Sequence, residues 1–118
     1  MEILARNQFP DEWRLIVISW AITEPKIQSV SLFGSRAKGK ARDDSDIDLA
    51  FDVFETPNET AVGVAIAFRG RWKKYLEQKL NWSVDLFHHA PGTVTASAVA
   101  EHAELLFARQ VMPRDQGV

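Results

Sequence analysis

Two short segments of this sequence alternate apolar and polar residues, and a glycine-serine pair stands between them. Residues 27–33 alternate with a period of two, and residues 46–53 do the same. A period of two is typical of a β-strand whose two faces meet different surroundings. In the second segment Ile47, Leu49, Phe51 and Val53 share one face, and the other face carries Asp46, Asp48 and Asp52. The pattern therefore predicts a sheet with an apolar face and an acidic face.

Apolar residues at helical spacing flank these strands. Asp11 is the expected N-cap of a first helix, which Pro25 stops, and a longer helix is expected from about Thr60 to Leu80, after a turn at 56–59. Residues 82–87 are predicted to form a third strand and residues 93–103 a last helix; residues 105–107 fit either a final strand or a continuation of that helix. The predicted fold is α/β, a small mixed sheet of three to four strands flanked by helices.

Length and composition narrow the functional classes. The 118 residues are enough for one domain, expected over residues 1–110 with a polar tail over 111–118. The absence of cysteine excludes disulfides, thiolate catalysis and thiolate metal sites. A net charge of −2 argues against a chain dominated by attraction to nucleic acid or membranes. No signal peptide or membrane span is recognisable, so a cytoplasmic protein is expected.

The near-zero net charge hides two blocks of opposite sign. Five basic residues and no acidic one lie between residues 26 and 42, and seven acidic residues without a basic one follow between residues 43 and 59. Such blocks form two solvated faces, or they form a site that holds an anion beside metal cations.

The second possibility gains support from the spacing of three carboxylates. Asp46 and Asp48 stand two residues apart on a predicted strand, so their side chains point the same way. Asp85 lies in the next short strand and converges with them if the two strands pair. Adjacent carboxylates repel unless a cation neutralises them, and magnesium is the natural partner for oxygen ligands. Three such groups can hold two ions at the spacing that suits displacement at phosphorus.

The Gly34-Ser35-Arg36 turn supplies a place for phosphate. A turn from a strand into a helix exposes backbone N–H groups, and glycine lets an anion approach closely. The Ser35 hydroxyl can donate a hydrogen bond, and Arg36 can add a charged donor to a triphosphate oxygen. This segment is therefore predicted to bind a triphosphate while the aspartates bind its metals.

The motif Gly34-Ser35, ten residues, then Asp46-x-Asp48 resembles the signature of the nucleotidyltransferase superfamily, in particular the minimal nucleotidyltransferases related to the DNA polymerase β palm. The resemblance covers nearly the whole chain, with Asp85 placed as the third carboxylate. It implies transfer of AMP from ATP to an acceptor hydroxyl. Asp46 and Asp48 would bind two Mg²⁺ ions, Asp85 would bind one and assist deprotonation of the acceptor, and Gly34, Ser35 and Arg36 would hold the β- and γ-phosphates.

The resemblance also implies a partner. Minimal nucleotidyltransferases commonly pair with HEPN toxins as antitoxins that adenylylate them, and the short chain leads us to expect that another chain completes the acceptor site, in a hetero-oligomer or a homodimer. Three alternatives remain open: a non-catalytic antitoxin that neutralises its partner by contact, a transferase acting on a small molecule or nucleic acid, and a merely solvated acidic strand.

Further residues are assigned ordinary roles. His88 and His89 are expected to be surface residues, with metal or acid/base function as the alternative. The basic side chains of the long helix are expected to form a solvated face, with docking of an acidic partner or nucleic acid as the alternative; they are Arg69, Arg71, Lys73, Lys74 and Lys79. The tryptophans are expected mostly in the core, with a protein interface as the alternative for Trp13 and Trp72; they are Trp13, Trp20, Trp72 and Trp82.

Overall fold

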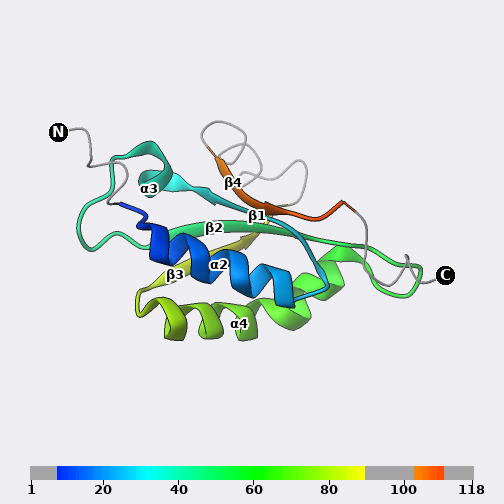
Figure 1. Ribbon diagram of the computed structural model, residues 1–118. Coiled ribbons are helices and arrows are strands. Elements are labelled where there is room, and N and C mark those ends of the chain that lie inside the picture. The colour runs from blue at the N-terminus through cyan, green and yellow to red at the C-terminus, as the bar shows by residue number, and fades with distance from the viewer. Residues whose placement is uncertain (1–7, 90–102, 111–118) are drawn as a thin grey trace.

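The computed structural model of the chain describes residues 8–89 and 103–110. A four-stranded sheet runs through them in the order β3-β2-β1-β4 (Figure 1). β1 pairs antiparallel with both β2 and β4, whereas β2 and β3 run parallel. The sheet is therefore mixed, as predicted. Its strands are β1 (Ile27–Phe33), β2 (Ile47–Val53), β3 (Val84–His88) and β4 (Glu104–Ala108).

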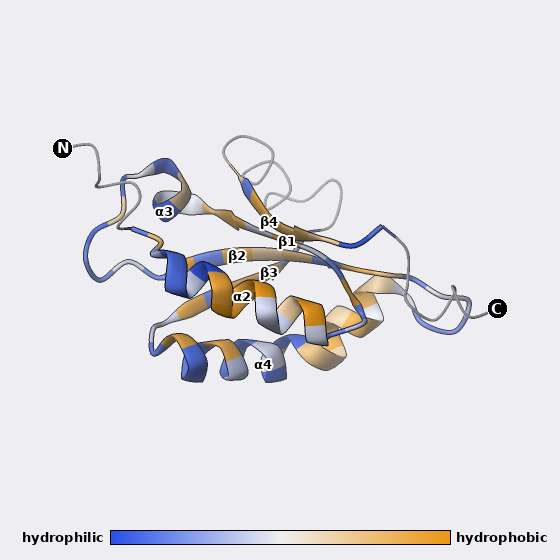
Figure 2. Cartoon of the chain, in the orientation of Figure 1, coloured by the Kyte–Doolittle hydropathy of each residue, from blue (hydrophilic) through white to orange (hydrophobic). Residues whose placement is uncertain are grey.

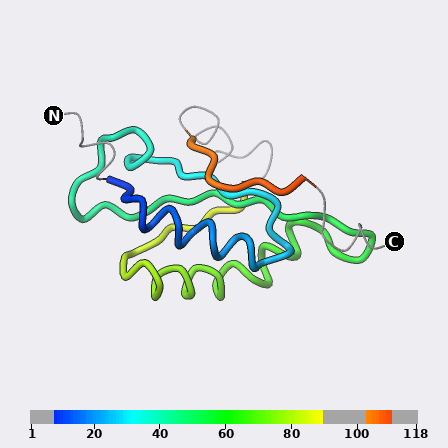
Figure 3. The backbone as a smooth tube through the Cα atoms, in the orientation of Figure 1, coloured from blue at the N-terminus to red at the C-terminus, as the bar shows by residue number. Residues whose placement is uncertain are grey.

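Two helices cover one face of the sheet. α2 (Asp11–Thr23) contacts β1 and β4, and α4 (Ala61–Leu80) contacts β2 and β3, so the helices lie side by side under the strands (Figures 1 and 3). The short α3 (Gly34–Lys38) connects β1 toward β2 at one end of the sheet. Apolar residues run along the strands in Figure 2, and the largest fully buried side chains include Trp72, Phe51, Ile47, Leu49 and Leu86.

Most of the expected elements are confirmed, and their ends shift by one or two residues. The first helix begins at Asp11, so Asp11 is its first helical residue rather than its N-cap as predicted. The N-cap is Pro10, and no side-chain hydrogen bond caps the helix. The long helix has Thr60 as its N-cap, whose hydroxyl accepts the Gly63 N–H, and ends at Asn81 in left-handed backbone geometry. Residues 105–107 belong to strand β4, which resolves the alternative left open for them.

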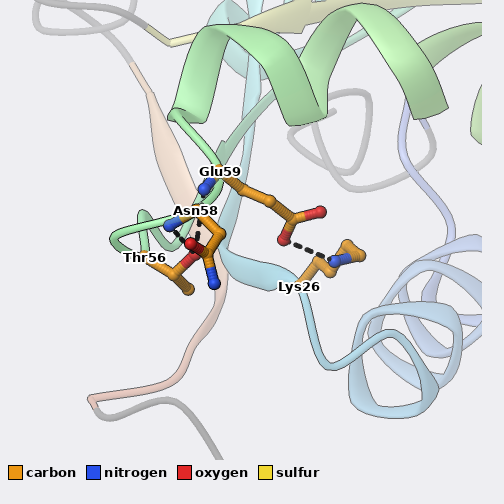
Figure 4. Close-up of polar contacts among 4 residues, drawn as sticks. All are labelled: Lys26, Thr56, Asn58 and Glu59. Atoms are coloured by element: carbon orange, nitrogen blue, oxygen red, sulfur yellow. Dashed lines mark hydrogen bonds and ion pairs between the residues drawn. The ribbon is translucent and has the colours of Figure 1, made fainter.

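The predicted turn at residues 56–59 is confirmed in the connection from β2 to α4. The Thr56 hydroxyl accepts hydrogen bonds from the backbone N–H groups of Asn58 and Glu59 (Figure 4). Lys26 then pairs with the Glu59 carboxylate at 2.9 Å, which ties this turn to the start of β1. The helix predicted over residues 93–103, except for its last residue, and the predicted tail over 111–118 lie outside the described residues.

Candidate active site

The sheet register brings two of the three predicted carboxylates, Asp48 and Asp85, next to each other, and Asp46 stands just before the strand that carries Asp48. Asp48 of β2 is the direct partner of Asp85 on β3 and of Phe33 on β1. Neighbouring strands lie about 4.8 Å apart, so the Asp48 and Asp85 side chains emerge next to each other. Asp46 stands directly before β2, which begins one residue later than the strand predicted from the sequence, and it lies two residues from Asp48. The charges of both Asp46 and Asp85 act on Asp48.

Apolar side chains surround the carboxylates on the sheet face that the helices leave uncovered. Phe33 and Ala50 form a small buried cluster with Phe87 packed against it, and the Phe33 and Phe87 rings meet edge to face with centroids 5.5 Å apart. Burial beside this cluster, followed by the charges of Asp85 and Asp46, raises the pKa of the Asp48 carboxyl to about 6. The Arg36 charge acts in the opposite direction and is outweighed.

We expect the metal-free protein to lose stability as the pH rises from about 4 to about 6. The folded state keeps a proton on Asp48 up to about pH 6, whereas an unfolded aspartate releases it near pH 4, so the free energy of unfolding falls across this window. Asp48→Asn removes the cost and should raise that free energy at pH 7.5 by about 1 kcal/mol, allowing for partial solvent exposure. Urea unfolding at pH 4 and pH 7.5 measures it; equal pH slopes for both proteins would contradict the expectation.

Gly34 lies directly against the Asp48 carboxyl group. Its φ of +76° places it in left-handed geometry, and a Cβ built there would stand 2.1 Å from Asp48 Oδ2. The glycine is therefore needed for two reasons at once, its backbone conformation and the space that Asp48 fills. Sequence reasoning assigned Gly34 to phosphate approach alone. The contact with Asp48 could be found only once the strand register was known.

The edge strand β3, which carries Asp85, is anchored by side chains of α4. Val84 N–H donates to Glu77 Oε2 at 3.0 Å, and Arg69 Nε donates to the Leu86 carbonyl at 2.5 Å. These contacts flank Asp85 on both sides in sequence. The hydrogen bond from Val84, with the contact from Lys73, lowers the pKa of Glu77. Sequence reasoning counted these residues as a solvated helix face and missed their role in holding β3.

Arg36 takes a different place from the one predicted. Its side chain is 6% exposed, and all three of its guanidinium nitrogens donate to backbone carbonyls rather than pointing away from the protein. Nη1 bonds the Gln8 carbonyl, while Nε and Nη2 both bond the Ser45 carbonyl. Burial lowers the pKa of Arg36, against the charges of Asp46, Asp48 and Asp43. The turn thus keeps its position beside the aspartates, but the arginine is directed into the protein.

The histidines lie at the other end of β3. His88 pairs with Phe51 in the register, three residues along from Asp85, and its Nε2 stands 3.7 Å from Asp52 Oδ1. The His89 N–H donates to the Phe51 carbonyl. Neither residue is brought to the carboxylates. Several basic side chains of α4 also have local partners: Lys73 pairs with Glu77, Arg71 lies over Phe68, and Lys79 lies over Tyr75.

The donor set fits a hard divalent cation. In the described part of the chain, no group of three carboxylate or imidazole side chains is already arranged around one point as metal ligands. Uncompensated carboxylates repel, and the raised pKa of Asp48 reports that repulsion together with burial. A cation would relieve both, and oxygen donors of this kind suit Mg²⁺. Asp46, Asp48 and Asp85 are the residues that would hold it.

A family profile described as "Polymerase beta, Nucleotidyltransferase" matches residues 17–111. The chain belongs to this nucleotidyltransferase family. The match runs from α2 to beyond β4, so it includes the Gly34 turn and all three carboxylates. The observed mixed sheet is consistent with the polymerase β-like fold that the sequence motif implied.

One relative of this nucleotidyltransferase is named for adenylyl transfer. A "Putative protein adenylyltransferase" of Methanocaldococcus jannaschii is 36% identical over 61 residues, which cover 52% of this chain and 63% of that protein, a little under two thirds of its length. Similar solved structures include a toxin–antitoxin with AMP-PNP, at a TM-score of 0.62 and 25% identity over 91% of this chain and 79% of that one.

A second solved structure shows likeness of fold. It contains a tri-AMPylated HEPN toxin of Shewanella oneidensis in complex with an MNT antitoxin, and it matches with a TM-score of 0.59 and 22% identity over 91% of this chain and 76% of that chain. No helix within residues 8–89 and 103–110 has both the length and the apolar character needed to span a bilayer.

Proposed function

We propose that this nucleotidyltransferase transfers AMP from ATP, with Mg²⁺, to a side-chain hydroxyl of a HEPN-type toxin encoded beside it, and so acts as the antitoxin. The observation that carries the proposal is the pairing of Asp48 with Asp85 across β2 and β3, with the Gly34 turn packed against Asp48. The adenylyltransferase relative and the toxin–antitoxin structure with AMP-PNP favour ATP as donor and a protein as acceptor.

The chemistry follows from the placement of each residue. Backbone N–H groups of Gly34 and Ser35, with the Ser35 hydroxyl, donate to the β- and γ-phosphates. Asp46, Asp48 and Asp85 would hold two Mg²⁺ ions, which when bound supply positive charge to the phosphate oxygens. Asp85 accepts the proton of the acceptor hydroxyl at a carboxylate oxygen. The oxygen of the acceptor hydroxyl forms a bond to the α-phosphorus, the bond from the α-phosphorus to the oxygen that bridges it to the β-phosphorus breaks, and pyrophosphate leaves.

The protein contributes mainly position and electrostatics. A loose phosphoryl-type transition state needs aligned oxygens and fixed charge more than covalent help from side chains. Asp48 and Asp85 stand on paired strands, so their spacing is set by the sheet rather than by a loop. The apolar cluster of Phe33, Ala50 and Phe87 lies on the same face of the sheet as Asp48 and Asp85. Burial is the largest cause of the raised pKa of Asp48, and a less polar surrounding strengthens the electrostatic interactions at the site.

The proposal is tested by incubating the protein with Mg²⁺, the product of the neighbouring reading frame, and ATP labelled at either the α- or the γ-phosphate. We expect label on the partner from α-labelled ATP only, because AMP is transferred and pyrophosphate leaves. Label from γ-labelled ATP only would indicate phosphoryl transfer instead, because the α-phosphate would then leave with ADP. A tight complex without label would favour an antitoxin that neutralises its partner by contact alone. Label on RNA or on a small molecule would mean that this molecule, and not the toxin, is the acceptor.

A further inference from the structure

The carbonyl oxygen of Ser45 accepts hydrogen bonds from two side chains that are distant in the sequence. Arg36 donates to it through Nε at 3.2 Å and Nη2 at 2.6 Å. Trp82 donates to it through Nε1 at 2.8 Å. Ser45 is the residue immediately before Asp46, so these contacts act on the peptide group that carries Asp46.

The guanidinium of Arg36 is itself held in place by two aromatic rings. It lies 5.3 Å from the ring centroid of Trp13 and 5.5 Å from that of Trp82, and the two rings stand 5.5 Å from each other. The remaining nitrogen, Nη1, donates to the Gln8 carbonyl at 2.7 Å. A flat guanidinium can stack on rings and donate in a fork at the same time, which a lysine ammonium cannot do.

Asp46 needs such support because it lies outside the strand. Asp48 and Asp85 are held by the ladder between β2 and β3, but the ladder begins at Ile47, whose N–H donates to the Ser83 carbonyl. The other polar groups of Ser45 are also fixed: its N–H donates to the Arg42 carbonyl, and its hydroxyl accepts from the Arg42 N–H. The backbone before Asp46 is therefore held by side chains where the sheet does not reach.

We propose that Arg36, Trp13 and Trp82 form a positioning clamp that sets the Asp46 carboxylate relative to the Gly34-Ser35 turn. The clamp rests on the proposed function, since it positions a metal ligand of that site. Arg36 follows Ser35 directly in α3, so the backbone of Arg36 belongs to the Gly34-Ser35 turn. Its guanidinium binds the Ser45 carbonyl, directly before Asp46. Arg36 is accordingly a positioning residue rather than a phosphate ligand.

Trp82→Phe is the sharpest test, because it keeps an aromatic ring beside Arg36 while it removes the indole N–H donor. We expect the dissociation constant for Mn²⁺, measured by electron paramagnetic resonance on the nucleotide-free protein, to rise about tenfold, as when a partner of a metal ligand is lost. Trp20→Phe is the matched control, since its Nε1 has no hydrogen-bond partner among the described residues. It should leave Mn²⁺ binding unchanged, with urea unfolding confirming that both variants are folded.

Arg36→Lys separates the clamp from the phosphate role. Loss of a phosphate ligand would weaken binding of AMP-PNP and leave Mn²⁺ binding to the nucleotide-free protein unchanged; loss of the clamp weakens Mn²⁺ binding by about tenfold or more. Unchanged Mn²⁺ binding in both Trp82→Phe and Arg36→Lys, or no Mn²⁺ binding by the wild-type chain, would overturn the clamp. Normal Mn²⁺ results with no AMP transfer to any partner would instead overturn the proposed function and leave the clamp standing.

Discussion

Replacing Asp48 with alanine is expected to lower nucleotidyl transfer by about 1,000-fold or more while the protein stays folded. The carboxylate stands between Phe33 and Asp85 in the sheet and is acted on by the charges of both other aspartates. Its loss removes a ligand for the ions that stabilise the charge developing on the phosphates, and effects of that kind reach about 10³ for one group. Asp46→Ala is expected to reduce transfer similarly.

The Asp48→Ala protein is expected to be at least as stable as wild type, although its transfer activity falls. Asp48 is desolvated and repelled in the metal-free protein, so alanine there relieves a cost and should not lower the unfolding midpoint. Asp52→Ala is the matched control, because Asp52 projects from the same face of the same strand, four residues along. It should keep transfer within about twofold of wild type. Labelled AMP transfer that survives Asp48→Ala would refute the catalytic arrangement.

The strands could be predicted from the sequence because alternation at residues 27–33 and 46–53 reports directly which side chains are buried. The structure places Ile47 and Leu49 in the core and Asp48 on the other face, as the pattern requires. Asp46 was assigned to the strand because alternation extends to it, but β2 begins one residue later, since the first backbone pairing available is that of Ile47 with the Ser83 carbonyl. The hydrophobic pattern of a sequence does not show at which residue the backbone hydrogen bonds to the neighbouring strand begin or end.

The support of the site could not be predicted, because it depends on contacts between distant segments. Arg36 next to a phosphate turn indicates an anion ligand when the sequence is considered alone. Only the folded chain brings the Gln8 and Ser45 carbonyls to its three nitrogens and the Trp82 ring to its guanidinium. The tryptophans divide in the same way. Trp20 and Trp72 are in the core as expected, whereas Trp13 and Trp82 enclose the arginine.

Gly34→Ala is expected to reduce transfer by about 100-fold or more and also to destabilise the fold. An alanine at φ +76° is strained by about 1–2 kcal/mol, and its Cβ would lie 2.1 Å from Asp48 Oδ2 and 2.9 Å from Asp48 Cγ. Either the turn or the Asp48 carboxylate must move, and each movement separates the phosphate site from a metal ligand. Gly39→Ala, at φ +73° on the other side of α3, is the control for backbone strain and should retain transfer.

A double-mutant cycle distinguishes the two consequences of the Gly34 substitution. If the clash with the carboxyl group contributes, Gly34→Ala should cost less stability in the Asp48→Ala background than in wild type, because Oδ2 and Cγ are gone and only the 3.1 Å contact with Cβ remains. Urea unfolding of the four proteins measures the coupling. Equal costs in both backgrounds would mean that backbone strain alone disfavours alanine. A smaller cost would show that the turn and the aspartate strand share one space, so that the geometry of the phosphate site and that of the metal site cannot vary independently.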